Sequence, residues 1–331
     1  MRINSAARAA RAAAAAVTLA ALAACTEPLP VAQPDPEQSV APAAATPEQL
    51  ERVLADVGAA LAAADEAASV DPLAPRVAGP AATMRAAEYT LQEAGDADAV
   101  TPVPTGIQTL VTPATAEWPR TVMAVTEPSA DLQPPLLLAL TQEDPRDAYT
   151  LQAWVRLFPG VEMPATTQPE IGSAPVTEAS PELSVATGEV LARYLDVLTN
   201  GAESEFAATF DEDPLRTGIL ATRDAYAELV AENGSLSQTY AVEDAGPWTM
   251  STADGGAIVM GAFRTQAAIT LVDSTLTIGD ETAAFLGTDT VTEDLGITWL
   301  SMVAFAVPPA GSDAPVTVLG AEHSPVAVSG K

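Results

Sequence analysis

The sequence has little of the residue types on which most catalytic and metal sites depend. Its 331 residues include one cysteine, Cys25, and one histidine, His323. A lone cysteine excludes an internal disulfide and cannot make a metal site by itself. A Ser-His-Asp or Cys-His site would have to use His323, and nothing near it in the sequence completes a triad. We therefore expect a non-enzymatic protein, with an exposed histidine close to the C-terminus.

Basic and aromatic residues are also scarce. The chain has 14 Lys+Arg against 44 Asp+Glu, a net charge of −30, and aromatics make up 5%. Such a surface repels nucleic acid, so we predict no nucleic-acid partner. The acids are spread along the chain rather than gathered in blocks, which favours a role in solubility over a surface for cationic partners.

Motifs for cofactors and metals are absent from the sequence. It contains no G-x-S-x-G, H-E-x-x-H, Walker loop or G-x-G-x-x-G, so we expect no cofactor and no metal. Acidic runs at 211–213, 243–244 and 293–294 leave open a carboxylate-dependent hydrolase or a Ca²⁺ site. None has calcium-loop spacing, and neighbours on a strand point to opposite faces. Solvated loops are the favoured interpretation of these runs.

The N-terminus carries the clearest signal in the sequence. Arg2, Arg8 and Arg11 precede the uncharged apolar run 12–24, which is too short to span a bilayer and is typical of a secretory signal. The last three residues of this run and the cysteine that follows, Leu22-Ala23-Ala24-Cys25, resemble the lipobox of bacterial lipoproteins. The resemblance implies that residues 1–24 are removed as a signal peptide and that lipid on Cys25 anchors an extracytoplasmic protein to the cell membrane.

The segment that follows predicts a tether. Residues 25–45 are rich in proline and alanine and have few large apolar side chains. Proline favours the polyproline II conformation, at about 3.1 Å per residue, so the segment would reach roughly 60 Å. It would hold the folded part away from the membrane.

Residues 46–162 have the pattern of a first α+β unit. The letters "TPEQ" at 46–49 fit a capping box, with Thr46 as N-cap and Gln49 reaching back, so a helix should begin there and end near Ala67. Periodicity does not decide between helix and strand for 81–93. Alternating or continuous apolar patterns predict strands at 106–112, 121–125, 136–140 and 149–158.

A segment rich in Pro, Thr, Ser and Ala, 163–181, is interpreted as a linker before a second α+β unit at 182–331. A bend or bulge is expected at Gly261. Helices that precede a run of strands, twice, predict an α+β fold with a helical part packed on a curved antiparallel sheet in each unit. The second unit is predicted to have a helix that Ser180-Pro181 opens and that runs on to Thr199, and further helices at 203–210 and 222–232. Strands are predicted at 236–242, 257–272, 276–278, 282–286, 298–307 and 316–319.

Two resemblances add expectations. The letters "YLDVLTNG" and "FAATFDEDP" make the second unit resemble cystatin-like and NTF2-like folds, which implies a fold and no activity. The letters "EWPRTVMAV" and "FAATFDEDPLRT" resemble uncharacterised actinobacterial lipoproteins built around a domain of unknown function. That resemblance implies no activity either.

The segment 140–164 gathers residues that the rest of the chain uses sparingly. Arg146, Trp154 and Arg156 are a candidate binding surface, because arginine and aromatic side chains are favoured at interfaces. The alternative is a packed strand with Trp154 in the core and arginines paired to local acids. We expect a binding or interaction module of the cell envelope, with an envelope protein or cell-wall partner. A carrier of lipid or solute and the hydrolase are the alternatives.

Overall fold

A large antiparallel β-sheet dominates the computed structural model, which describes residues 41–128 and 133–331. Its strands follow the order β1-β2-β3-β4-β11-β10-β7-β5, and β6 pairs with the same edge of β7 as β5. The mixture of helices with a large antiparallel sheet was predicted and is confirmed. The strands of this sheet are β1 (Ile107–Val111), β2 (Arg120–Thr126), β3 (Leu136–Gln142), β4 (Thr150–Leu157), β5 (Gly234–Val242), β6 (Trp248–Ser251), β7 (Ala257–Leu271), β10 (Asp294–Val307) and β11 (Thr317–Gly330).

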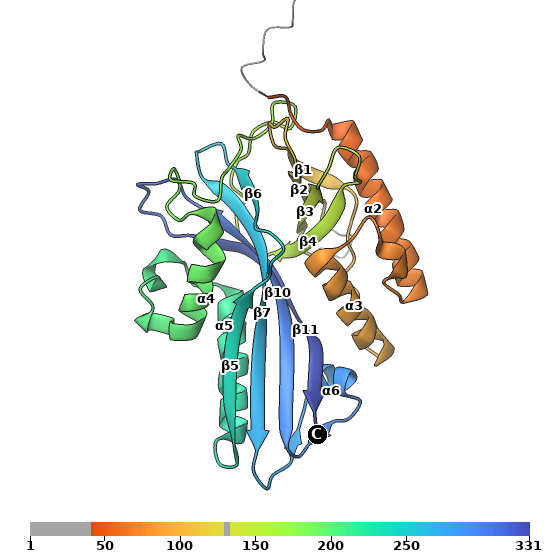
Figure 1. Cartoon of the computed structure of the whole chain (residues 1–331), viewed down its shortest axis with the longest axis vertical. Helices are drawn as coiled ribbons and strands as arrows, with labels where there is room; N and C mark the ends of the chain where they lie inside the picture. The colour runs from red at the N-terminus through yellow and green to blue at the C-terminus, as the bar shows by residue number, and fades with distance from the viewer. Residues whose placement is uncertain (1–40, 129–132) are drawn as a thin grey trace, which may run out of the picture. The chain divides into compact units, whose positions relative to one another are not determined.

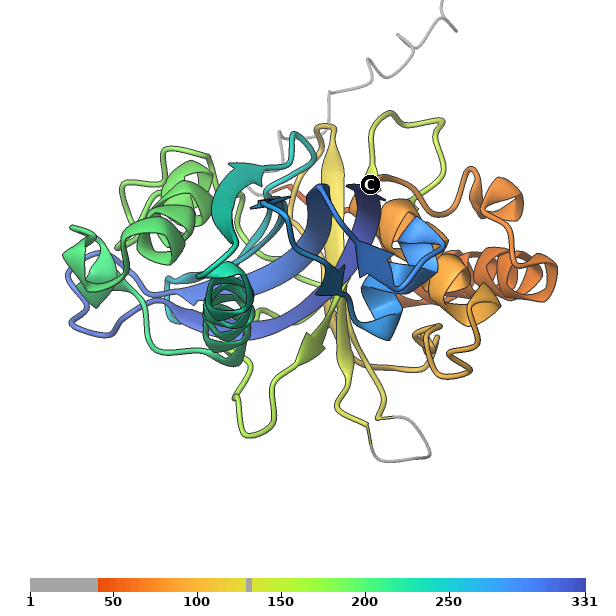
Figure 2. The ribbon, with the colours of Figure 1, turned by 90° about the horizontal axis from the view of Figure 1, so that it is seen from below.

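Helices cover both faces of the sheet. The helices α2 (Pro47–Ala67) and α3 (Gly79–Glu93) lie on one side, and α4 (Val190–Asn200) and α5 (Pro214–Val230) lie on the other (Figures 1 and 2). The central strands bury both faces, so they are apolar at nearly every position. On β7, Met260 packs in the core beneath α2 and α3, while Val259 and Phe263 pack in the core beneath α4.

The start of α2 matches the prediction from the sequence. Thr46 accepts a hydrogen bond from the backbone N–H of Gln49, and the Gln49 side chain accepts one from the Thr46 N–H, which completes the capping box. The helix ends at Ala67, as predicted. One stripe of the helix is buried, with Leu50 and Leu54 almost fully covered. Residues 81–93, for which the sequence left two possibilities, belong to α3.

The helices of the second half differ from the prediction in their bounds. The helix expected to open at Ser180-Pro181 begins only at Val190, after the 3-10 turn η2 (Thr187–Glu189). Residues 203–210 form no α-helix; they hold parts of two short 3-10 turns, η3 (Gly201–Glu203) and η4 (Ala207–Thr209). The third helix starts early, at Pro214, because the Asp213 side chain caps it by accepting from the Arg216 N–H.

The strand predicted at 282–286 is wrong. These residues lie in a short helix, α6 (Asp280–Leu286). Two acids in its first turn and Gly287 in the left-handed conformation at its end are local helix signals, and they outweigh the β-propensity of the segment. The two-stranded sheet β8 (Leu276–Thr277) and β9 (Thr290–Val291) flanks α6. The helix lies beside β11 (Figures 1 and 2), along the part of that strand that β4 does not pair.

The two-unit arrangement is not confirmed. Strands from both halves of the chain join in one sheet, because β4 pairs with β11 through Leu157 with Gly320 and Arg156 with Ala321. We call this short junction the seam. Residues 41–331 form one compact unit. The segment interpreted as a linker is attached to the first half as well, since the Thr112 hydroxyl donates to the Pro169 carbonyl and Ser173 is fully buried.

Gly261 serves helix packing and no bulge is present at it. The pairing of β7 with β10 continues without a register shift from Ala257 to Thr270. A Cβ atom added at Gly261 would lie 2.9 Å from both terminal carbons of Leu191. The glycine therefore lets α4 approach the sheet closely.

Candidate functional site

Pockets for small ligands measure roughly 300–1,000 Å³. The hollow beside α2, of about 610 Å³, combines such a size with charged and aromatic walls. We call it the arginine groove. Its walls come from α2, from the residues just before it, and from the loops at one end of β2, β3 and β4. The lining residues used below are Arg52, Arg76, Trp118, Arg120, Gln142 and Tyr149.

The first wall of the groove comes from α2 and the segment after it. Arg52 and Asp56 stand one helical turn apart on α2, away from its buried stripe. Arg76 reaches the same place because the next residue, Val77, forms a parallel bridge with Leu151 of β4. Arg76 and Asp56 form an ion pair. This pair ties the chain after α2 to the helix and fixes one guanidinium at the rim.

The second wall is an arginine stacked on an indole. The guanidinium carbon of Arg120 lies 3.6 Å from the centroid of the Trp118 ring, which is the geometry of a cation–π contact. Arg120 also donates to the backbone carbonyls of Glu117, at 3.2 Å, and Ala44, at 3.1 Å. The Trp118 N–H donates to the Gln142 side chain at 3.1 Å. Both side chains are therefore held in place by contacts that do not use a carboxylate.

Two donors in the groove have no partner among the described residues. Arg52 forms no ion pair within 41–128 and 133–331, in contrast to Arg76. The Tyr149 hydroxyl is buried without a hydrogen bond, and the whole residue is only 7% exposed. Burial raises the pKa of Tyr149, and the charge of Arg120 acts in the opposite direction, which shows that the two groups are close. A buried donor without a partner is costly and calls for an explanation.

The structure separates the three residues of the predicted binding surface. Trp154 is 0% exposed and packs under α3, with the Arg85 guanidinium 5.3 Å from its ring centroid. Trp154 is thus a core residue and cannot line a surface, because α3 covers the face of β4 on which it stands. Arg146 is exposed in the loop before β4, between two residues that line the arginine groove. Arg156 lies near the opposite end of β4.

Arg156 belongs to an ionic cluster at the seam, in which Arg85 and Glu88 are buried while Arg156 and Glu322 are half-buried. Its Nε lies 3.4 Å from Glu322 Oε1, and beneath α3 the Arg85 Nη1 lies 2.9 Å from Glu88 Oε2. Burial raises the pKa of Glu88, and burial together with the charge of Glu88 raises the pKa of Glu322 to about 7, against the effect of Arg156. Two acids with raised pKa values suit a hydrolase. However, Arg85 and Glu88 are 1% and 4% exposed, so a substrate has no access to them.

His323 also has a structural environment. Its Nδ1 lies 2.8 Å from the Ser301 hydroxyl, and its ring stacks on Trp299 with centroids 6.2 Å apart. Desolvation lowers the pKa of His323. The residue keeps an exposed surface, so water limits that shift. Ser301 is 0% exposed, and its hydroxyl therefore cannot act as a nucleophile on a bound substrate.

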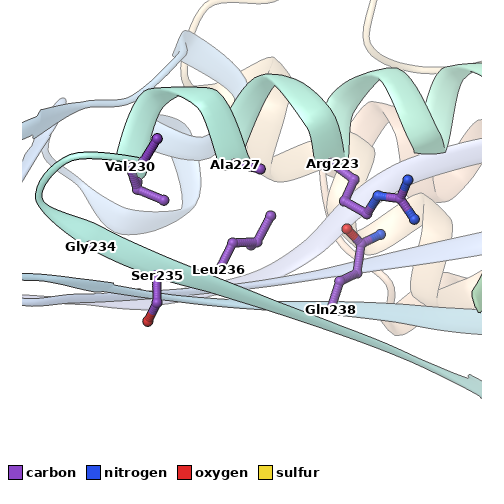
Figure 3. Close-up of a pocket in the computed structure, with 8 residues that line it drawn as sticks. Arg223, Ala227, Val230, Gly234, Ser235, Leu236 and Gln238 are labelled. Carbon is purple, nitrogen blue, oxygen red and sulfur yellow. The ribbon is translucent and has the colours of Figure 1, made fainter.

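A second hollow lies between α5 and β5 and is drawn in Figure 3. Leu236 points from β5 toward the helix, Ser235 points to the other face of the sheet, and Arg223 and Gln238 face each other at one end. Arg223 is paired with Asp224 at 3.1 Å, and the Gln238 amide donates to the Tyr240 hydroxyl. Its polar groups are thus satisfied by the chain itself, and this hollow offers a ligand less than the arginine groove does.

The acidic runs of the sequence have mostly structural partners. Asp213 caps α5, Asp211 accepts from the Thr317 hydroxyl, and Glu243 pairs with Arg264. Where the structure describes the chain, no three His, Cys, Asp or Glu side chains gather closely enough to hold a metal ion. The same residues contain no helix that is long and apolar enough to cross a membrane. Cys25 and residues 25–40 of the predicted tether lie outside the described residues.

Comparison with known proteins gives one match. A family profile described as Domain of unknown function (DUF8094) matches residues 41–330, nearly the whole described part of the chain. No curated protein and no solved structure matches. The predicted domain of unknown function is thereby confirmed. The actinobacterial origin and the lipobox stay predictions, and the likeness to cystatin-like and NTF2-like folds is not confirmed.

Proposed function

We propose, from the premise that the chain belongs to the family of the Domain of unknown function (DUF8094), that this protein is a binding module of the cell envelope. In this proposal, lipid on Cys25 holds it on the outer side of the membrane, and the folded part binds an envelope component without chemical conversion. The observation that carries the proposal is the arginine groove, which faces solvent and has donors that no described residue satisfies.

Charge strengthens this assignment. Arginines are rare in a chain of net charge −30, yet three of them line one groove, together with Asp56 and Asp147. Arginine beside a tryptophan is a combination that recurs in binding surfaces, and Trp118 here is half-buried. Arg52 is exposed outside the core and forms no direct ion pair with an acid of the described residues; its charge acts on Glu48, one helical turn earlier on α2.

The alternatives have less support. A carrier of lipid or solute needs a large apolar cavity between helices and sheet, and the space beneath α2, α3 and α4 is filled by buried core side chains. A hydrolase needs two acids that a substrate can reach in a cleft. Of the pair that the structure brings together, Glu322 is half-buried and Glu88 is buried beneath α3 and paired with Arg85.

Photo-crosslinking in intact cells tests the binding role. A photoreactive amino acid replaces Ala55, which is exposed on α2 and lines the groove, and in a matched control it replaces Ala225, which is exposed on α5. We expect an adduct of defined mass from position 55 that is absent from position 225. Loss of this adduct in Trp118→Ala would place the contact in the groove. Identical adduct patterns from both positions would refute the proposal.

The anchor has its own test. Cys25→Ser removes the thiol that would carry the lipid, so we expect the protein to move from the membrane fraction to the soluble extracytoplasmic fraction. Metabolic labelling with a fatty acid should mark the wild-type protein and leave Cys25→Ser unmarked. A Cys25→Ser protein that stays membrane-bound with its signal removed would show that the anchor is not this lipid.

A further inference from the structure

We propose that the arginine groove is a site for an oxyanion, a carboxylate or a phosphate, held by the guanidinium of Arg52 and the hydroxyl of Tyr149. The inference rests on the proposed function and assigns the chemical class of the ligand. The groove brings an arginine without an ion pair among the described residues and a buried hydroxyl without a hydrogen bond to one hollow of ligand size.

The unpaired donors are the first argument. A guanidinium presents planar N–H donors that match the two oxygens of a carboxylate or phosphate. Arg52 has no such partner within the described ranges, whereas Arg76 is already paired with Asp56. The Tyr149 hydroxyl is a buried donor without a hydrogen bond in the wall of the same groove. An oxyanion in this groove would give the Tyr149 hydroxyl, on which the charge of Arg120 also acts, an acceptor and would pair with Arg52.

The fixed wall is the second argument. Arg120 is locked by two backbone carbonyls and by the Trp118 ring, so its charge is present whether or not a ligand is bound. A donor that is already oriented loses little entropy when it binds. Elsewhere the acidic surface of a chain with net charge −30 repels an anion. The groove is lined by three arginines together with Asp56 and Asp147, so it is less acidic than the chain as a whole.

The size and composition of the groove limit the rest of the ligand. About 610 Å³ accommodates a small molecule or a short segment of a larger one. Val53, Pro145 and Trp118 give the walls apolar surface next to the arginines. The ligand that fits therefore combines an anionic group with an apolar or ring-shaped part.

Calorimetric titration of the purified full-length protein tests the anion site. The probes are inorganic phosphate and citrate, each compared with sodium chloride at the same ionic strength. We expect at least one probe to bind and Arg52→Gln to weaken it about tenfold, which is 1.4 kcal/mol. Arg223→Gln removes the same charge from the hollow beside α5 and should leave the affinity within about twofold, because it lies outside the groove.

Tyr149→Phe separates a ligand role from a structural one. Its hydroxyl has no partner in the protein, so removing it should leave the thermal stability unchanged or slightly higher without the probe. With the probe, the affinity should fall several-fold. A variant with unchanged affinity would overturn the role of Tyr149 and with it the proposed site.

Each outcome of the titrations decides the inference. Preference for citrate assigns a carboxylate and preference for phosphate assigns a phosphate, and either supports the site. Absence of binding beyond the chloride control would overturn the inference. Equal loss of affinity in Arg52→Gln and Arg223→Gln would mean an adventitious ion only and would overturn it as well. An adduct from position 55 without anion binding would overturn this inference and leave the binding role intact. Anion binding with identical adducts from positions 55 and 225 would support the anion site and refute the binding role in the envelope.

Discussion

Asp213 shows how one acidic side chain holds two elements together. Its Oδ1 accepts from the Tyr194 hydroxyl at 2.9 Å and from the Arg216 N–H at 2.8 Å. It therefore caps α5 and satisfies the buried phenol of α4 at the same time. No local pattern indicates the contact with Tyr194, although Asp213 followed by Pro214 is a recognisable helix start. What looked like a solvated acidic run contains a structural residue.

Asp213→Ala should destabilise the protein. It removes the cap, at about 1 kcal/mol, and leaves the Tyr194 hydroxyl buried without an acceptor, at about 1–3 kcal/mol. Asp213→Asn keeps an oxygen acceptor in the same place and should recover most of the loss. Urea unfolding of the three proteins measures this. Equal stabilities of the Ala and Asn variants would contradict the assigned hydrogen bonds.

Glu322 should make stability depend on pH. Its pKa in the folded state is about 7, above the ordinary 4.5, because it is buried and close to Glu88. A raised pKa means that the protonated form fits the folded state better, so this stabilisation is present below about pH 4.5 and is lost as pH rises to about 7. The loss would amount to at most about 3 kcal/mol.

Urea unfolding at pH 5 and pH 8 measures that loss. Glu322→Gln removes the titrating group and keeps the side-chain shape, so the fall in stability between the two pH values should be smaller in Glu322→Gln than in the wild type. An equal fall in both proteins would show that Glu322 titrates normally.

At the scale of the elements, capping residues and apolar stripes predict those helix ends that depend on interactions between neighbours in the sequence. The Thr46 capping box and the apolar stripe after it gave α2 with correct ends. Residues 282–286 were misread as a strand, although Asp280, Glu281 and Gly287 are helix signals on both sides. The late start of α4 has no such signal, because the preceding chain is held by tertiary contacts: the Thr187 hydroxyl donates to the Thr177 carbonyl.

The contact between α4 and β7 can be tested with a double-mutant cycle. Gly261→Ala would place a methyl group against the terminal carbons of Leu191 and should cost about 1–3 kcal/mol of stability. In a Leu191→Ala background the space is free, so the same change should cost much less. Urea unfolding of the four proteins gives the coupling energy. Additive costs would mean that the glycine serves another purpose.

At the scale of the whole molecule, pairing between strands far apart in the sequence assembles the arginine groove and joins the two halves of the chain in one sheet. No local pattern in the sequence predicts such pairing. Trp118 and Arg120 lie in the segment EWPRTVMAV, which carried one of the resemblances, and Arg146 was a candidate binding residue. The groove also needs Arg52 and Tyr149, which no pattern connected with them. These residues meet because β2, β3 and β4 pair and α2 packs on them. The scarcity of arginine was the only usable signal. Likewise, no local pattern indicated that the two halves share one sheet.

The seam makes Gly320 essential to that shared sheet. A Cβ atom at this position would collide with the backbone carbonyl of Arg156 on the paired strand, and a backbone atom cannot move aside easily. Gly320→Ala should therefore destabilise the protein by more than about 2 kcal/mol. Gly296→Ala on β10 is the matched control, because it would meet only the Ser329 hydroxyl, which can rotate away. Thermal unfolding compares the two, and similar losses would argue against a tight seam.

The seam also orders the steps by which the chain folds. The hairpins β2–β3, β3–β4 and β10–β11 join neighbours in sequence, whereas the seam joins Leu157 to Gly320 across most of the second half. Closing so long a loop costs conformational entropy before the contacts of the seam can form and offset it. The seam should therefore form after the hairpins. Gly320→Ala should then accelerate unfolding and leave refolding nearly unchanged. Stopped-flow measurements in urea would reveal this, and slower refolding would place the seam in the folding nucleus.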